Sequence, residues 1–104
     1  MKLVDVHCHL NDSRFDVDRD EVLARFKEKG GEIIVTSGVN PESNRESLKL
    51  AERYDVVRAC FGIYPTDALA AEVESGESNE LLRELKEFDL DEELAWIEAH
   101  KSDC

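Results

Sequence analysis

The first 65 residues alternate between strand-like and helix-like segments, and this order limits the folds that the chain can adopt. Strand-like runs over residues 2–9, 32–38 and 56–63 are short and rich in apolar and β-branched side chains. Helical patterns with short connections separate these runs. Successive strands that are joined through a helix usually pair in parallel through a right-handed crossover. The sequence therefore predicts an α/β fold built on a parallel sheet.

Local signals mark the ends of the two helices in this region. Asp18 and Glu21 fit a capping box at the start of the first helix, and Gly30 follows its end at the position typical of a C-terminal cap. The second helix is predicted to begin with Asn40 as its N-cap and Pro41 as its first residue. These signals place both helices between the predicted strands, as βαβ units require.

Acidic residues accumulate in the C-terminal part, which has only helical patterns after Pro65. The formal net charge is −12: residues 1–66 hold 12 acidic and 10 basic side chains, whereas residues 67–104 hold 13 and 3. A surface this negative does not attract a phosphate backbone by charge alone, although a bound divalent metal could offset the field locally. Broad nucleic-acid affinity is therefore not expected, and a solvated helical face is the simplest interpretation of the acidic half.

The three cysteines, Cys8, Cys60 and Cys104, do not form the even framework of a disulfide scaffold. Cys8 and Cys60 lie in apolar strand-like runs, so both are expected to be buried as small hydrophobic side chains. The sequence begins without an apolar stretch of signal length, and it contains no candidate transmembrane segment. We therefore expect a cytoplasmic protein with reduced thiols and no association with membranes.

The segment VDVHCHLND, residues 4–12, contains the most specific chemical feature of the sequence. The side chains of a strand alternate between two faces, so one face would carry Asp5, His7 and His9. The other face would carry only apolar side chains that suit packing against helices: Val4, Val6, Cys8 and Leu10. Two imidazoles at the end of a strand can share a metal ion, and Asp5 could orient one of them through a hydrogen bond. The spacing alone leaves open a structural or incidental pair.

The histidine pair would not complete a metal site by itself. A catalytic zinc ion usually has about three protein ligands. The remaining histidine, His100, is expected to be exposed near the end of a helix, where it would interact with the helix dipole. The third strand would also have an open edge unless another strand paired with it. Since the sequence ends at Cys104, where a fourth strand is expected, both the metal site and the sheet are predicted to be incomplete.

Five segments of the sequence resemble the TatD-like metal-dependent hydrolases in their order and spacing. They are DVHCHL at 5–10, FDVDRDEVL at 15–23, GGEIIVTSG at 30–38, SLKLAERY at 47–54 and GIYP at 62–65. The resemblance implies a TIM barrel of about 250 residues, of which this chain would provide about three N-terminal β/α units followed by helices. It also implies that residues 1–104 form a single domain, the N-terminal part of that barrel.

By this resemblance, His7 and His9 would be the first two ligands of a site for one or two divalent metal ions, Zn, Mn or Mg. The family's further ligands and acid–base groups come later in a full-length barrel, so no catalytic residue is expected within this chain. The family typically hydrolyses DNA phosphodiester bonds with these metals. The substrate would thus be DNA or a small phosphodiester, and the chain alone is expected to be inactive.

One position departs from the family pattern. The family motif usually reads Gly-Ile-His-Pro, whereas Tyr64 takes the place of the histidine in this chain. A phenol can donate a hydrogen bond to phosphate, but it cannot act as a base near neutral pH. Tyr64 would therefore either bind substrate or pack as an aromatic side chain, and the substitution leaves the substrate open.

Two alternatives compete with a truncated hydrolase. The chain could be a non-catalytic acidic α/β interaction module in which C-terminal apolar side chains cap the open sheet: Leu81, Leu82, Leu85, Phe88 and Trp96. It could also be a related phosphoesterase that begins with the same His-x-His pattern. An open barrel fragment is in addition expected to self-associate through its exposed strand edge.

Overall fold

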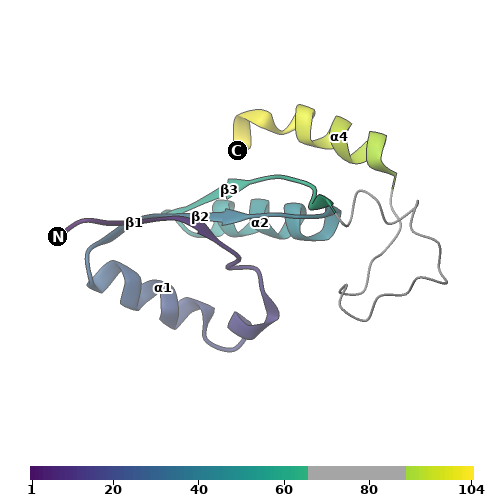
Figure 1. Ribbon diagram of the computed structural model, residues 1–104. Helices are drawn as coiled ribbons and strands as arrows, with labels where there is room; N and C mark the ends of the chain where they lie inside the picture. Colours follow the sequence, from purple (N-terminus) through teal and green to yellow (C-terminus); the bar gives the residue numbers. More distant parts are fainter. Residues whose placement is uncertain (66–88) are drawn as a thin grey trace.

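The computed structural model describes residues 1–65 and 89–104, and it contains a three-stranded parallel sheet in the order β1-β2-β3 (Figure 1). The strands are β1 (Leu3–Cys8), β2 (Gly31–Ser37) and β3 (Val57–Cys60). The helices are α1 (Arg19–Glu28), α2 (Pro41–Arg53) and α4 (Leu90–Ala99), with the short 3-10 helices η1 (Ser13–Phe15) and η3 (Lys101–Asp103). The parallel α/β sheet predicted from the sequence is thus confirmed.

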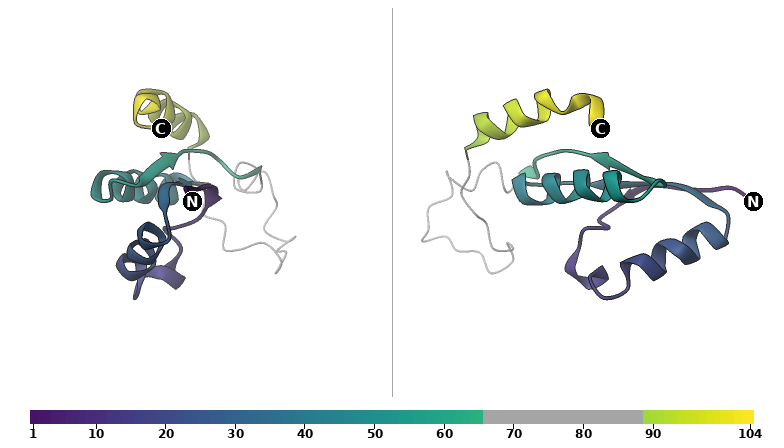
Figure 2. Two further views of the ribbon diagram at one scale, coloured as in Figure 1. Left: turned by 90° about the vertical axis from the view of Figure 1, so that its left-hand side faces the viewer. Right: turned by 180° about the vertical axis from the view of Figure 1, so that it is seen from behind.

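Both connecting helices cover the same face of the sheet. Ile34 of β2 is buried on this face, in one apolar cluster with Leu23 of α1 and Leu50 of α2. Val57 of β3 joins the cluster and is only 1% exposed. The left panel of Figure 2 shows α1 and α2 on one side of the strands. Removal of these aliphatic side chains from water is the main force that holds both helices against the sheet.

The opposite face of the sheet is open. Val4 and Val6 are 54% and 73% exposed, so the prediction that they pack against helices is wrong. The cause is the irregular pairing of β1 with β2. One register shift places Val4 beside Ile33 rather than beside a buried residue, and a second shift, between Asp5 and Cys8, separates Val6 from the face on which Cys8 packs against the core. Cys60, also predicted to be buried, is exposed because β3 turns Ala59 toward the helices and Cys60 away from them.

Two of the three predicted helix ends are confirmed. α2 begins with Pro41 as its first helical residue and Asn40 as its N-cap. Asn40 Oδ1 accepts a hydrogen bond from the backbone N–H of Ser43 at 2.8 Å, and Ser43 Oγ accepts one from the backbone N–H of Asn40 at 3.0 Å, which together form a capping box. Gly30 follows α1 with a φ of 97°, which glycine adopts without strain. The capping box at Asp18 is wrong: Asp18 is the N-cap, but its φ of −129° and ψ of 17° lie outside the extended region, and its side chain caps nothing.

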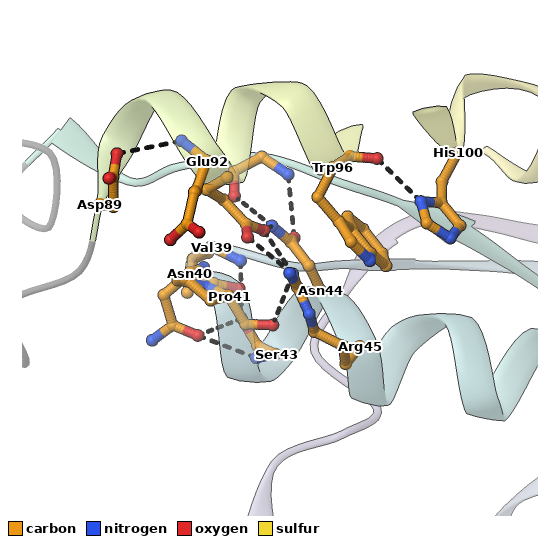
Figure 3. Close-up of polar contacts among 12 residues, drawn as sticks. Val39, Asn40, Pro41, Ser43, Asn44, Arg45, Asp89, Glu92, Trp96 and His100 are labelled. Carbon is orange, nitrogen blue, oxygen red and sulfur yellow. Dashed lines mark hydrogen bonds and ion pairs between the residues drawn. The ribbon is translucent and has the colours of Figure 1, made fainter. Parts of the chain in front are cut away.

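A buried polar cluster joins α4 to α2 (Figure 3). Asn44 of α2 is fully buried, and its amide donates to a Glu93 carboxylate oxygen at 2.7 Å. The same side chain donates to the Gly62 carbonyl and accepts the Gly62 backbone N–H, both at 3.0 Å. Arg45 donates to both Glu93 oxygens at 2.7 Å, and Glu93 is only 2% exposed. Because a buried carboxylate is costly without partners, this cluster fixes the position of α4.

Trp96 packs beside this polar cluster. Its ring meets Phe61 edge-on with centroids 5.0 Å apart, and the Arg45 guanidinium lies 4.0 Å from its centre. His100 stacks on Trp96 at 4.0 Å and caps the end of α4, with its Nδ1 2.8 Å from the Trp96 carbonyl (Figure 3). The helix-terminal position predicted for His100 is confirmed, but the side chain is half-buried instead of exposed.

Several expectations concern residues outside the described part of the chain. The helical patterns noted after Pro65 lie there as far as residue 88, and so do four of the five proposed capping side chains: Leu81, Leu82, Leu85 and Phe88. Among the helices that the structure does describe, none combines the length and the apolar composition needed to cross a membrane.

Replacement of Asn44 by alanine tests the polar cluster. We expect Asn44→Ala to lower the free energy of unfolding by about 2–4 kcal/mol, because Glu93 and both backbone groups of Gly62 lose a buried partner. Urea unfolding followed by circular dichroism measures the change. Lys49→Ala, at an exposed position of the same helix, is the matched control. Equal stability of the two variants would contradict the anchoring role of Asn44.

Candidate functional site

A hollow of about 1040 Å³, here named the strand-end hollow, lies where the three strands end. Its wall includes His7 and His9 from the end of β1, residues 37–40 around the end of β2 and residues 60–65 around the end of β3. Parallel strands end at the same edge of a sheet, so segments that are distant in the sequence meet there. Ligands of α/β proteins generally bind at this edge, which makes the hollow the candidate site.

The side chains of His7 and His9 lie next to each other in the strand-end hollow. Their ring centroids are 5.3 Å apart, and the ring planes are nearly perpendicular at 87°. Cys8, between them, pairs with Thr36, packs against the apolar core, and donates its thiol to a β2 carbonyl at 3.6 Å. Its partial burial, together with the charge of Asp5, raises the pKa of the Cys8 thiol, so this thiol stays protonated at neutral pH. The two imidazoles therefore share one side of the strand, and Cys8 takes the other.

A hydrogen bond determines the tautomer of the His9 ring. Nδ1 of His9 lies 2.9 Å from the Ser37 carbonyl oxygen, which can only accept, so Nδ1 carries the proton. Nε2 of the neutral ring then keeps its lone pair, the form in which histidine binds metals. The backbone after His9 is held as well, because the Leu10 N–H donates to the fully buried Thr36 hydroxyl at 3.1 Å.

The histidine pair fits part of a metal site. Two imidazoles on one tetrahedral ion, each with a Zn–N distance of about 2.1 Å, have centroids about 5 Å apart, close to the 5.3 Å between His7 and His9. Within residues 1–65 and 89–104, no group of three or more potential ligands comes together. Asp5, which was expected to orient a histidine ring, instead accepts the backbone N–H of His7 at 3.0 Å. The described residues thus offer two ligands and a carboxylate that stabilises the strand.

Acidic side chains line the rim of the strand-end hollow: Asp12, Asp16, Glu42 and Glu46. Hydrogen bonds from the side chain and backbone of Arg14 hold the pKa of Asp12 below its ordinary value, with Nε 3.1 Å from the carboxylate. Arg19 donates to Asp16 at 3.0 Å. A negative rim attracts a divalent cation, and it opposes an anionic phosphate unless such a cation is present.

Tyr64 lies on the wall of the hollow, at the position predicted to bind substrate. Its side chain is 50% exposed, and its backbone N–H donates to the Val39 carbonyl at 2.7 Å. This bond ties the segment after β3 to the segment after β2. Tyr64 is thus placed where a ligand in the hollow could reach its phenol.

Three residues that carry no predicted role position the hollow. Arg19 donates to the Leu10 carbonyl at 2.8 Å, and Thr36 accepts from the same residue, so both hold the chain directly after the histidines. Asn44 holds Gly62 on the opposite wall. The burial of Asn44 could have been predicted from the sequence, because this polar residue lies at helical spacing from the apolar Leu48 and Ala51 and so on the same side of the helix. No comparable pattern marks Arg19.

Known proteins with similar sequences include hydrolases and nucleases. An uncharacterized metal-dependent hydrolase of Bacillus subtilis is 36% identical over 67 residues, which cover 64% of this chain and 26% of that protein. The human deoxyribonuclease TATDN3 is 33% identical over 100 residues, 95% of this chain and 34% of that protein. The 3'-5' ssDNA/RNA exonuclease TatD of Salmonella typhimurium is 33% identical over 66 residues, 64% of this chain and 25% of that protein.

The chain thus spans about a quarter to a third of the length of these relatives. A family model described as TatD related DNase matches residues 4–99, which is nearly the whole chain. The match begins in β1 just before the histidine pair and extends to the end of α4. The chain therefore belongs to the TatD related DNase family.

Proposed function

We propose that this chain is the N-terminal part of a metal-dependent hydrolase that cleaves DNA phosphodiester bonds. One observation carries the proposal: His7 and His9 lie side by side in the strand-end hollow, and the His9 tautomer leaves Nε2 available to a metal. The relatives support it, since two are named as nucleases and one as a metal-dependent hydrolase. Because the chain spans only part of these relatives, the activity is proposed for a larger barrel.

The arrangement of the elements supports the proposal of a partial TIM barrel in which residues 1–104 form one domain. Both crossover helices lie on one face, whereas a doubly wound sheet has helices on both faces. The open face carries apolar Val4 and Val6 along β1 and the histidines at its carboxyl end, an arrangement typical of a barrel interior. α4 follows β3 and lies beside α2, where the helix of a third β/α unit is expected (Figure 1).

In this proposal, His7 and His9 bind one divalent ion, and the remaining ligands come from other parts of the barrel. Imidazole nitrogens favour zinc over magnesium, which prefers oxygen ligands, and manganese accepts both kinds. Such an ion, when bound, supplies an activated water and positive charge for the phosphate. The four acidic side chains that line the hollow, two of them paired with arginines, attract the cation, and they make binding of an anionic phosphodiester dependent on that cation.

Tyr64 is proposed to contact the substrate. Its half-exposed side chain lies on the wall of the hollow, and the bond to the Val39 carbonyl limits movement of its backbone. A phenol can donate a hydrogen bond to a phosphate oxygen, but it is a poor base at neutral pH. Tyr64 would therefore position the substrate and take no part in proton transfer.

Zinc titration tests the two proposed ligands. His7→Ala and His9→Ala should each weaken zinc binding by more than about tenfold, because each removes one of two imidazoles that share the ion. Isothermal titration calorimetry measures the affinities. His100→Ala is the matched control, since His100 stacks on Trp96 and does not line the hollow. If all four proteins bound zinc equally, the assignment of His7 and His9 would be wrong.

A polypeptide of only these 104 residues should show no nuclease activity, because two imidazoles do not complete a catalytic metal site. Release of a fluorescent label from single-stranded DNA, in the presence of manganese or zinc, is a suitable assay. Robust turnover that disappears in the His7→Ala variant would contradict the proposal, because it would mean that these 104 residues hold a complete catalytic site.

The open sheet supports a second proposal, self-association of the chain. Val4 and Val6 are largely exposed, and the outer edge of β3 has no paired strand among the described residues. Sedimentation velocity should show a concentration-dependent mass above that of the monomer. Val6→Lys should reduce this mass, whereas Val17→Lys, at a position that is 98% exposed outside the sheet, should not. A monomer at every concentration would rule out self-association.

A further inference from the structure

Two cysteines that are distant in the sequence lie together beside β3. Cys60 is the last residue of β3, and Cys104 directly follows η3. Both are free thiols, and both are exposed. Every view in Figures 1 and 2 places the C-terminal residue over β3. We infer that Cys60 and Cys104 form a redox-responsive pair whose oxidation to a disulfide fastens η3 to the end of β3.

Aromatic contacts hold the two cysteines in this arrangement. Phe61 directly follows Cys60, and its ring meets Trp96 with centroids 5.0 Å apart. His100 stacks on the same tryptophan at 4.0 Å, and η3 begins directly after it. The route from Cys60 to Cys104 therefore runs through side chains in contact, and the buried anchor of α4 keeps the tryptophan in place. The proximity of the thiols is a consequence of this packing.

The two thiols already influence each other. The pKa of Cys60 is raised, first by its partial burial, then by the charge of Cys104 and by a hydrogen bond between the two side chains. Since the thiolate is the reactive species, a raised pKa slows oxidation at neutral pH and makes it faster as the pH rises.

The chemistry requires a two-electron oxidant, for which a peroxide is sufficient. One thiolate attacks a peroxide oxygen, the O–O bond breaks, and a sulfenic acid and hydroxide form. The second thiolate attacks the sulfenic sulfur, so the S–S bond forms and the S–O bond breaks. The two sulfurs together lose two electrons. Both oxygens of hydrogen peroxide leave as water, which takes up the two thiol protons.

The disulfide would act on the candidate site as well as on stability. Cys60 lines the strand-end hollow together with His7 and His9, so its oxidation changes the wall of that hollow. A bond from Cys60 to Cys104 also closes a long loop of chain, which restricts the unfolded state. The pair depends only on the packing of α4 and η3, so it stands whether or not the hollow hydrolyses DNA.

Peroxide treatment of the purified protein tests the inference. Thiols counted with Ellman's reagent after denaturation should fall from the three cysteines of the sequence to one. Trypsin cuts after Arg58, Arg83 and Lys101, so a reducible bond should link peptide 59–83 to the peptide that begins at residue 102. The melting temperature should rise by on the order of 10 °C and return on reduction.

Three single variants distinguish this bridge from other oxidation products. Cys8→Ser should keep the linked peptide and the rise in melting temperature, whereas Cys60→Ser and Cys104→Ser should lose both. The serine variants should match the reduced protein in melting temperature, since both thiols are exposed. Disulfide-linked dimers in place of the internal bridge, or sulfinic acids on separate cysteines, would overturn the inference.

Discussion

The packing of Leu23 and Leu50 against Ile34 places both crossover helices on one face of the parallel sheet. The hydrophobic effect has no direction of its own, but a pleated strand turns each neighbour of a buried residue toward the opposite side. That side is therefore open, and at its carboxyl end it presents His7 and His9 to one hollow. The position of the candidate site therefore depends on which face of the sheet the helices cover, more than on any contact within the site.

Features encoded in adjacent residues were predictable from the sequence. The start of α2 at Asn40 and Pro41 needs only local chemistry, as does the left-handed conformation of Gly30. The box predicted at Asp18 failed because a capping side chain also needs an extended backbone, which the tight turn before α1 does not provide. Val6 was predicted on the wrong face because the register of β1 depends on a distant strand.

The parts of the candidate site that depend on neighbouring residues alone were also predictable from the sequence. His7 and His9 lie two residues apart in one strand, so the sequence pattern was sufficient to predict that they share a side, but not that Val6 lies on that side as well. The His9 tautomer depends on the Ser37 carbonyl, which only the pairing of two strands brings near. Asp5 shows the limit of the pattern, since a local hydrogen bond to the backbone takes its carboxylate away from the rings.

The polar anchor of α4 was beyond the reach of local patterns. Asn44 could be placed on the buried side of its helix, but its partner Glu93 lies 49 residues further along the chain. Asn44 also lies so close to Gly38 that no side chain would fit there: a Cβ added to Gly38 would lie 2.1 Å from the Asn44 amide oxygen. One buried amide thus links the segments after β2 and β3 to α4, and it holds two walls of the hollow in place.

Nitrogen-15 NMR of the histidine rings tests most directly whether His7 and His9 share a metal ion. The bond to the Ser37 carbonyl predicts that His9 carries its proton on Nδ1. Added zinc should then shift the Nε2 resonance of His9 together with a ring nitrogen of His7, and it should leave His100 unchanged. A His9 ring protonated on Nε2, or zinc-dependent shifts in His100 alone, would contradict a shared site at the end of β1.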